Sequence, residues 1–172
     1  MSDIVDSLSK LEVVVVGAGP SGLTAATALS RQGHRVTVLE RQPALQSPGG
    51  PLTIQASASK CLYHLGAKKI LEENSLEMDS MAWWSFEEDQ PMAVVPFPVI
   101  SRTPRHRVNR PLIQKIMYDV AVESGVSVMF GKNVVRLSET AQSTQLWAQD
   151  GEQWKADLIV GADGTATTSL TY

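Results

Sequence analysis

Three glycines near the N-terminus have the spacing of a loop that binds the pyrophosphate of a dinucleotide. The sequence VVVVGAGPSGLTAA places Gly17, Gly19 and Gly22 in the pattern G-x-G-x-x-G. The first glycine permits a tight turn, the second lets the backbone approach the pyrophosphate, and the third lets a helix pack closely on a strand. A helix that begins here would also turn its free N–H groups and the positive end of its dipole towards the phosphates.

An acidic residue follows roughly 20 residues after this pattern, which is the distance expected for a ribose contact. Glu40 closes the valine-rich segment HRVTVLE. A carboxylate at this point can accept hydrogen bonds from both hydroxyls of an adenosine ribose, and it would repel a 2′-phosphate. Together the glycines and Glu40 predict a site for the ADP half of a dinucleotide. They leave NAD and FAD as alternatives, because both contain that half.

These residues need a strand, a helix and a second strand to position them. The apolar run from Leu11 to Val16 ends at a glycine, as expected for a strand of a parallel sheet that is buried on both faces. Residues 21–30 favour a helix that Gly33 would end, and residues 34–40 predict a second buried strand. The beginning of the chain therefore predicts a βαβ unit.

The rest of the chain alternates helical and strand-like patterns. Asn109 is a candidate N-cap for one of the helices, and Asp150 with Gly151 predicts a two-residue hairpin turn. Trp83 and Trp84 adjoin on a predicted strand, and we expect them to pack in the core rather than stack on a substrate. The predicted helices span 57–65, 67–74 and 109–123, and the predicted strands span 81–86, 92–100, 126–130, 134–137, 144–148, 152–155 and 156–161.

Size and composition favour one domain with a small ligand. The 172 residues predict a short tail over 1–10 and a single domain over 11–172. The net charge of -3 and the absence of a basic stripe argue against nucleic acid and anionic membranes as partners. One cysteine, no secretory signal and no apolar run of about 20 residues favour a cytoplasmic protein. The three histidines are scattered, so no metal site is predicted.

The order of the motifs resembles the FAD-dependent aromatic-ring monooxygenases of the salicylate hydroxylase type, including related fungal secondary-metabolite monooxygenases. Four stretches between Leu11 and Gly164 carry the resemblance. In one of them Pro51 and Ser57 replace a glycine and an asparagine of the family pattern. The stretches are VVVVGAGPSGLTAATALSRQGHRVTVLER, GGPLTIQASASKCLYHLG, RVNRPLIQKI and DLIVGADG.

The resemblance implies an α/β fold of the FAD/NAD(P)-binding, Rossmann-like type, with three layers, a parallel sheet and a three-stranded β-meander. It implies FAD as the cofactor, NAD(P)H as a transient electron donor and a small aromatic or related molecule as the substrate. No catalytic residue is assigned. The residues implied in cofactor binding are Gly17, Ala18, Gly19, Pro20, Ser21, Gly22, Glu40, Arg41, Gly50, Arg110, Val134 and Asp163.

Two of these residues have a chemical reason of their own to meet the flavin half. Arg110, at a predicted helix start, can direct a fork of N–H donors at diphosphate or ring oxygens. Asp163, at a predicted strand end, can accept a bond from a ribityl or ribose hydroxyl, although an Asx-turn explains it equally well.

The resemblance fades at Thr165. Where the family continues with a serine and an arginine, this chain has Thr167 and Leu170. The substrate-binding sheet and the second flavin motif of the family have no counterpart in the 172 residues. We therefore expect a fold that is incomplete at its C-terminus, an isolated chain without hydroxylase activity, and possible self-association through an exposed sheet edge.

Two alternatives to the monooxygenase hypothesis stay open. The chain could be a noncatalytic dinucleotide-binding fragment or one half of a split protein. An NAD-linked dehydrogenase is disfavoured, because no Tyr-x-x-x-Lys or other hydride-transfer constellation is present.

Overall fold

The computed structural model describes residues 10–46, 49–97, 103–139 and 144–164. Contacts within the chain divide it into two compact units. The first combines Met1–Ser47 with Gln114–Tyr172, and the second is Pro48–Ile113. None of the helices in the described part of the chain is long and apolar enough to span a membrane.

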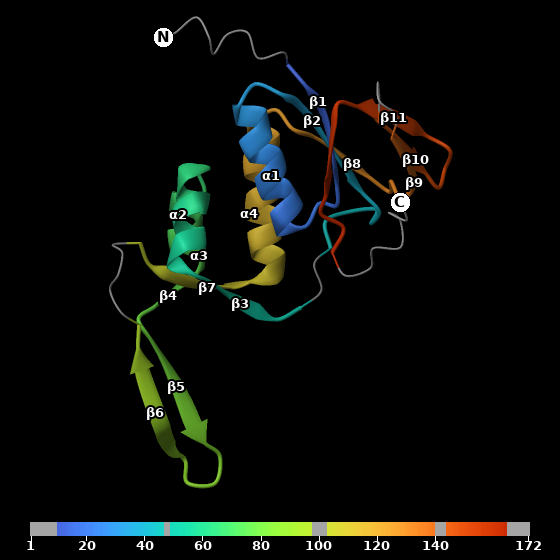
Figure 1. The fold of residues 1–172 in the computed structure, drawn as a ribbon. Helices are drawn as coiled ribbons and strands as arrows, with labels where there is room; N and C mark the ends of the chain where they lie inside the picture. Colours follow the sequence, from blue (N-terminus) through green and yellow to red (C-terminus); the bar gives the residue numbers. More distant parts are fainter. Residues whose placement is uncertain (1–9, 47–48, 98–102, 140–143, 165–172) are drawn as a thin grey trace, which may run out of the picture. The chain divides into compact units, whose positions relative to one another are not determined.

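The first unit is built on a parallel sheet with the strand order β12-β1-β2-β8. These strands are β1 (Glu12–Val16), β2 (Arg35–Glu40), β8 (Ser127–Phe130) and β12 (Leu158–Gly161). Figure 1 labels β1, β2 and β8 of this sheet. The four valines of β1 are at most 6% exposed. A central strand covered on both faces needs apolar side chains at every position, which explains the unbroken valine run.

Helices cover one face of this sheet. In Figure 1, α1 (Pro20–Arg31) and α4 (Arg110–Glu123) lie alongside each other against it. The Ser30 hydroxyl donates a hydrogen bond of 2.6 Å to the Ser124 carbonyl, which links the ends of the two helices. Because α1 connects β1 to β2, which pair in parallel, the predicted βαβ unit is confirmed.

A β-meander covers the other face. It consists of β9 (Val134–Glu139), β10 (Thr144–Ala148) and β11 (Gln153–Ala156), paired in an antiparallel sheet. Apolar side chains of the two sheets pack into one core cluster, formed by Val14, Val16, Leu39, Val134, Leu146 and Ala156. The predicted three-layer α/β fold with a parallel sheet and a three-stranded meander is therefore confirmed.

The strand β12 is less buried than its sequence predicts. We expected a fully buried strand, but Leu158 is 39% exposed and Ile159 and Val160 are half-buried. Within the described residues β12 pairs only with β1 and ends the sheet, so neighbours cover it from one side alone. Self-association through this edge stays a prediction.

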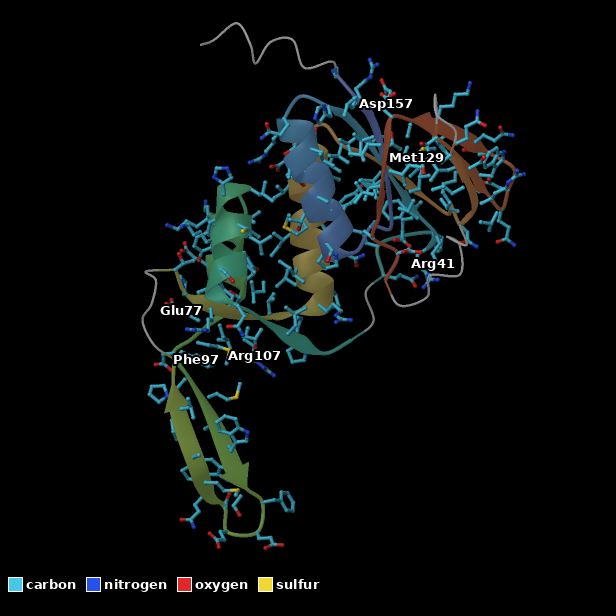
Figure 2. All side chains as sticks on the ribbon, in the orientation of Figure 1. Arg41, Glu77, Phe97, Arg107, Met129 and Asp157 are labelled. Atoms are coloured by element: carbon cyan, nitrogen blue, oxygen red, sulfur yellow. The ribbon has the colours of Figure 1, made fainter. Side chains whose placement is uncertain are left out.

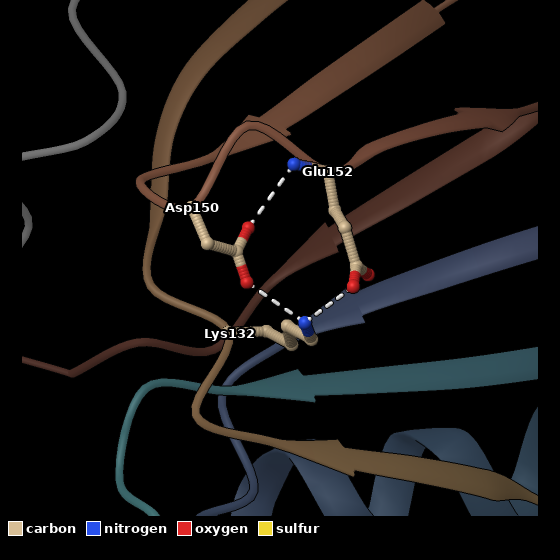
Figure 3. A network of polar contacts seen from close by, with 3 residues as sticks. All are labelled: Lys132, Asp150 and Glu152. Carbon is tan, nitrogen blue, oxygen red and sulfur yellow. Dashed lines mark hydrogen bonds and ion pairs between the residues drawn. The ribbon is translucent and has the colours of Figure 1, made fainter.

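Lys132 holds the turn between β10 and β11 (Figure 3). Its Nζ lies 2.8 Å from Asp150 Oδ2 and 2.7 Å from Glu152 Oε1, while Asp150 Oδ1 accepts a bond from the Glu152 N–H. The hydrogen bond to Lys132 lowers the pKa of Asp150, and the bonds to Asp150 and Glu152 raise the pKa of Lys132. These contacts are open to solvent, so they orient the turn more than they stabilise it.

The turn is one residue longer than predicted. Ala148 donates to the Glu152 carbonyl and Gly151 donates to the Ala148 carbonyl, which leaves the three residues 149–151 in the loop. Gly151 has a φ of 88°, in the left-handed region that favours glycine. A three-residue hairpin loop commonly ends in such a residue, so the Asp-Gly pair fits this loop as well as a two-residue one.

The second unit contains a small sheet backed by two short helices. The strands are β3 (Pro51–Ile54), β7 (Arg105–Asn109) and β4 (Leu76–Met78), in the order β3-β7-β4. The helices α2 (Ala56–His64) and α3 (Lys68–Asn74) contact β7 and confirm two predicted helices. None of the three strands was predicted. In β7 the alternation of buried His106 and Val108 with exposed Arg107 is the signal that could have revealed it.

A two-stranded hairpin completes the second unit. It consists of β5 (Ser80–Ser85) and β6 (Gln90–Pro96), as predicted, although predicted strand residues 98–100 lie outside the described part. The expected core packing of Trp83 and Trp84 is wrong, because their exposed fractions are 52% and 58%. A two-stranded sheet without a packed layer leaves the side chains of both its faces in solvent.

A buried histidine joins β7 to both helices of the second unit. His106 is 1% exposed; its Nε2 lies 2.6 Å from the Tyr63 hydroxyl on α2, and its Nδ1 lies 2.7 Å from the Ser75 hydroxyl after α3. Ser75 donates its only hydroxyl proton to the Leu71 carbonyl. It must therefore accept from His106 Nδ1–H. In a neutral imidazole, Nε2 then carries no proton and accepts from the Tyr63 hydroxyl.

The surroundings of the pair favour uncharged forms of both rings. Burial lowers the pKa of His106 and outweighs the opposing charges of Glu77 and Glu72. Burial, followed by the same two carboxylates, raises the pKa of Tyr63 to about 12. Near neutral pH both rings are therefore uncharged, and His106 Nε2 can accept a hydrogen bond from the Tyr63 hydroxyl.

This network predicts a loss of stability in mild acid. Since the pKa of His106 is lower in the folded chain than in the unfolded chain, the unfolded state binds the proton more readily, and stability falls as the pH drops below about 6.5. We expect the melting temperature to fall between pH 7.5 and pH 5.5 and this fall to be smaller in His106→Gln. His64→Gln is the matched control. An equal fall in His106→Gln and the parent would contradict the assignment.

Candidate functional site

The glycine loop lies where β1 meets α1. Gly17 donates to the Leu39 carbonyl at 2.8 Å, and Leu23 donates to the Gly19 carbonyl at 3.0 Å to begin the helix. No side chain caps this helix start, and its first turn contains no acidic residue. Among the described residues, no side chain thus occupies the N–H groups of the first turn of α1, which suits a phosphate ligand.

The three glycines are required for different reasons. Gly17 has a φ of 106°, and a Cβ there would lie 2.5 Å from the Ala162 carbonyl oxygen. A Cβ at Gly22 would overlap the Gly17 carbonyl oxygen. At Gly19 a Cβ would meet no described protein atom within 4 Å. The fold thus excludes side chains at Gly17 and Gly22, whereas Gly19 keeps open a space that no described part of the protein fills.

Glu40 is held beside this loop by two backbone N–H groups. Its Oε2 accepts from Ala18 and its Oε1 from Gln42, each at 2.8 Å. A carboxylate has about four lone-pair sites, so each oxygen can still accept a bond from a ligand hydroxyl. The predicted contact with a ribose stays a prediction, and the structure adds a second role: Glu40 ties the glycine loop to the end of β2.

Gln114 supports the other side of the loop. Its Nε2 donates 2.8 Å to the Ala18 carbonyl, and the side chain is 5% exposed. With Glu40 bound to its N–H, Ala18 is thus fixed at both backbone polar groups. Sequence reasoning missed Gln114. The available signal was an amide between the apolar residues Ile113 and Ile116 on the buried side of a helix.

A cavity of about 810 Å³ opens beside the second glycine turn, within the first unit. Its size is within the range of small-molecule sites. Ser21 and Asp163, both predicted to bind the cofactor, contribute to its lining together with Gly161, Gly164, Leu137 and Ile159. The Ala162 N–H donates to the Val16 carbonyl at 2.8 Å, which fixes this turn beside the end of β1.

Three further residues of the first unit that were predicted to bind the cofactor lie at the start of α1, at the end of β2 and in the core. Pro20 is the first residue of α1, and Arg41 directly follows β2 with an exposed side chain (Figure 2). Val134 is 3% exposed and packs in the core between the two sheets. If Val134 contacts a cofactor, its main chain must make that contact.

Arg110 and Gly50 belong to the second unit. Arg110 begins α4, and its side chain passes Gly49, where an added Cβ would lie 3.2 Å from Arg110 Cδ. Gly49 has a φ of 135°, so a side chain would be strained there in any case. A Cβ at Gly50 would meet no described atom within 4 Å. The loop and the arginine thus form a group of predicted cofactor residues within the second unit.

The chain matches a family model described as "FAD binding domain" over residues 10–170. It is 32% identical to the FAD-dependent urate hydroxylase of Klebsiella pneumoniae, over 90% of this chain and 41% of that protein. It is 27% identical to 3-hydroxybenzoate 6-hydroxylase 1 of Aquipseudomonas alcaligenes, over 88% and 40%. The chain therefore spans about two fifths of the length of these relatives.

Solved structures show the same fold. The structure of 2-methyl-3-hydroxypyridine-5-carboxylic acid oxygenase matches with a TM-score of 0.82 and 25% identity, over 94% of this chain and 42% of that chain. Klebsiella pneumoniae HpxO in complex with FAD matches with a TM-score of 0.74 and 30% identity, over 87% and 38%.

The glycine geometry predicts that stability responds differently at two positions of the loop. Gly22→Ala places a methyl group against a backbone oxygen, so we expect the free energy of unfolding to fall by about 1–3 kcal/mol. In Gly19→Ala the added methyl group would lie in open space, and the backbone there is extended. We therefore expect the free energy of unfolding to change by less than about 0.5 kcal/mol. Urea unfolding measures the free energy of unfolding of both variants. Similar losses in the two would contradict the prediction that the fold requires a glycine at position 22 but not at position 19.

Proposed function

Because this chain belongs to the FAD binding domain family, we propose that it holds FAD through the loop around Gly19 and through Glu40. We further propose that the flavin serves the NAD(P)H-dependent hydroxylation of a small aromatic or related molecule in the cytoplasm. The exposed single cysteine, Cys61, fits a reducing compartment.

The space at Gly19 is the observation that carries the proposal. The described part of the protein gives no steric reason for a glycine there, since an added Cβ would meet no described atom within 4 Å. A ligand that approaches the backbone closely does require one, and the pyrophosphate of a dinucleotide is such a ligand. The uncapped start of α1 beside it supplies N–H donors and a favourable dipole.

Bound FAD supplies the redox chemistry of the reaction, and the protein binds and orients it. In this proposal the first turn of α1 would bind the pyrophosphate. Glu40 would accept hydrogen bonds from the ribose hydroxyls while it also accepts from the Ala18 and Gln42 N–H groups. Asp163 would accept a hydrogen bond from a hydroxyl of the ribityl chain. Arg110 would bind the flavin half through its guanidinium.

The names of the relatives support the substrate class. One relative is a urate hydroxylase, and others are a 3-hydroxybenzoate 6-hydroxylase and a 3-amino-4-hydroxybenzoate 2-monooxygenase. All of these names denote hydroxylation or monooxygenation of small ring compounds. A noncatalytic role in dinucleotide binding is the second candidate, because the glycine loop and Glu40 can hold an ADP group whether or not chemistry follows.

The binding proposal predicts a selective loss of affinity in two variants. Gly19→Val should abolish FAD binding, because its side chain would occupy the space of the pyrophosphate. Glu40→Ala should weaken binding by about 1–3 kcal/mol through the loss of charged hydrogen bonds. Quenching of flavin fluorescence during titration measures both effects, and thermal unfolding verifies that Gly19→Val is folded.

Lys69→Gln is a suitable control, because the ion pair that this exposed side chain makes among the described residues, with Glu73, is as long as 3.9 Å. If Gly19→Val and Glu40→Ala bind FAD as the parent does, the proposed site is wrong. Oxidation of NAD(P)H tests the expectation that the isolated chain lacks hydroxylase activity. We expect FAD binding without a substrate-dependent increase in this oxidation, and an increase that yields a hydroxylated product would contradict the expectation and support the monooxygenase.

A further inference from the structure

The hairpin of β5 and β6 contains most of the large apolar side chains that are exposed in the described structure. All residues of β6 and the four central residues of β5 are exposed. Phe86 in the turn is 100% exposed, and Met92 is 74% exposed. An exposed apolar surface of this kind usually marks an interaction site, and an isolated two-stranded hairpin is at best marginally stable in water. The hairpin therefore needs a partner.

Apolar side chains occupy both faces of the hairpin. Cross-strand partners share a face, and Met81 pairs with Val95 while Ala82 pairs with Val94. Because successive residues of a strand point to opposite faces, these two pairs lie on different faces. A partner that packs on one face would leave the other in water. A partner strand that lengthens the sheet at its edge continues both faces at once.

The two edges of the hairpin differ in their capacity to accept another strand. Edge strands are commonly protected by charged residues or by proline. In β6, Pro91 and Pro96 have no N–H to donate to a neighbour. In contrast, β5 reads SMAWWS, without proline or charge, and within the described residues it pairs only with β6. The outer edge of β5 is therefore the one open to a further strand.

The two ends of β5 differ in charge. In the turn that follows it, residues 87–89 are all acidic. At its start, the Phe97 N–H donates to the Asp79 carbonyl at 2.7 Å, and the guanidinium carbon of Arg105 lies 4.4 Å from the centre of the Phe97 ring (Figure 2). The Asp79 carboxylate lies at this end too and accepts from the Ser80 hydroxyl at 2.8 Å. None of the six ion pairs among the described residues involves the acidic turn or Arg105.

We propose that two copies of this chain associate through β5, so that their hairpins form one antiparallel, four-stranded sheet with a two-fold axis near Ala82. The antiparallel arrangement brings the acidic turn of each copy towards the Arg105 end of the other. A parallel arrangement would instead set the two acidic turns side by side, where they repel each other.

The two-fold axis also makes the interface self-complementary. It runs perpendicular to the sheet, so equal faces of the two hairpins lie on the same side, and Met81 and Trp83 of one copy continue the apolar face of the other. A symmetric dimer requires this match of one patch with itself. The inference goes beyond the proposed function and does not depend on it, because none of the residues assigned to FAD lies in the hairpin.

Sedimentation velocity on the whole 172-residue chain tests the association itself. We expect a reversible equilibrium of monomer and dimer with a Kd on the order of 10 µM. A chain that stays a monomer up to about twentyfold that concentration would overturn the proposal and leave the hairpin to a different partner.

Variants with one added lysine locate the interface. Ala82→Lys should raise the Kd of the dimer about tenfold or more, because it brings two like charges together at the two-fold axis. Ala93→Lys is the matched control, since it makes the same substitution in β6, away from the interface, and should dimerise as the parent does. Leu158→Lys changes the exposed edge of β12 and should also leave the Kd unchanged. Thermal unfolding verifies that all three variants are folded.

Two outcomes of this series would overturn the pairing through β5. Equal losses in Ala82→Lys and Ala93→Lys would show that a face of the hairpin, and not its edge, makes the contact. Dimers that only Leu158→Lys disrupts would assign the association to β12.

Disulfide linking tests the antiparallel arrangement. In a Cys61→Ser background, which removes the single native thiol, Ala82→Cys should give a covalent dimer on oxidation with diamide, because the axis places the two introduced thiols close to each other. Ala93→Cys in the same background should stay unlinked under the same conditions. Linking at position 93 but not at position 82, or at neither position in a dimeric sample, would refute the proposed interface.

Discussion

The close approach of three backbone segments around Gly17 is the constraint on which the first unit depends. The end of β1, the first turn of α1 and the turn after β12 meet at distances that leave no room for a Cβ at Gly17 or Gly22. Gly17 also donates to the Leu39 carbonyl, which brings the end of β2 to the same point. The positions of Glu40, Ser21 and Asp163 all follow from this junction.

Around this junction, buried polar contacts fix the loop in one conformation. Ala18 is 0% exposed, and its N–H and carbonyl groups would be costly to bury without partners. Glu40 and Gln114 supply those partners from β2 and α4. The loop is therefore organised before any ligand arrives, and a preorganised site spends less of its binding energy on ordering itself.

The sequence predicted correctly those parts of the molecule in which a residue pattern is compatible with only one kind of local structure. The valine run, the spaced glycines and the Asp-Gly hairpin gave the parallel sheet, the βαβ unit and the meander. It failed where strands are short and polar, as in β7, where only His106 and Val108 mark the buried face. It also failed for Trp83 and Trp84, because hydrophobicity predicts burial only where a second layer is present to cover the side chain.

The candidate site shows the same division. The glycines and Glu40 could be found because their spacing is set by covalent geometry and the βαβ connection. Gln114 was missed because its helix pattern marks a buried amide but not its partner, which lies 96 residues away along the chain. The His106 network of the second unit was missed for the same reason, since its partners lie 43 and 31 residues away. The contrast between Gly19 and its two neighbours bears on evolution. A descendant that had lost its ligand could accept any of several residues at position 19 while it still required glycine at positions 17 and 22, so the middle glycine records selection for binding rather than for folding.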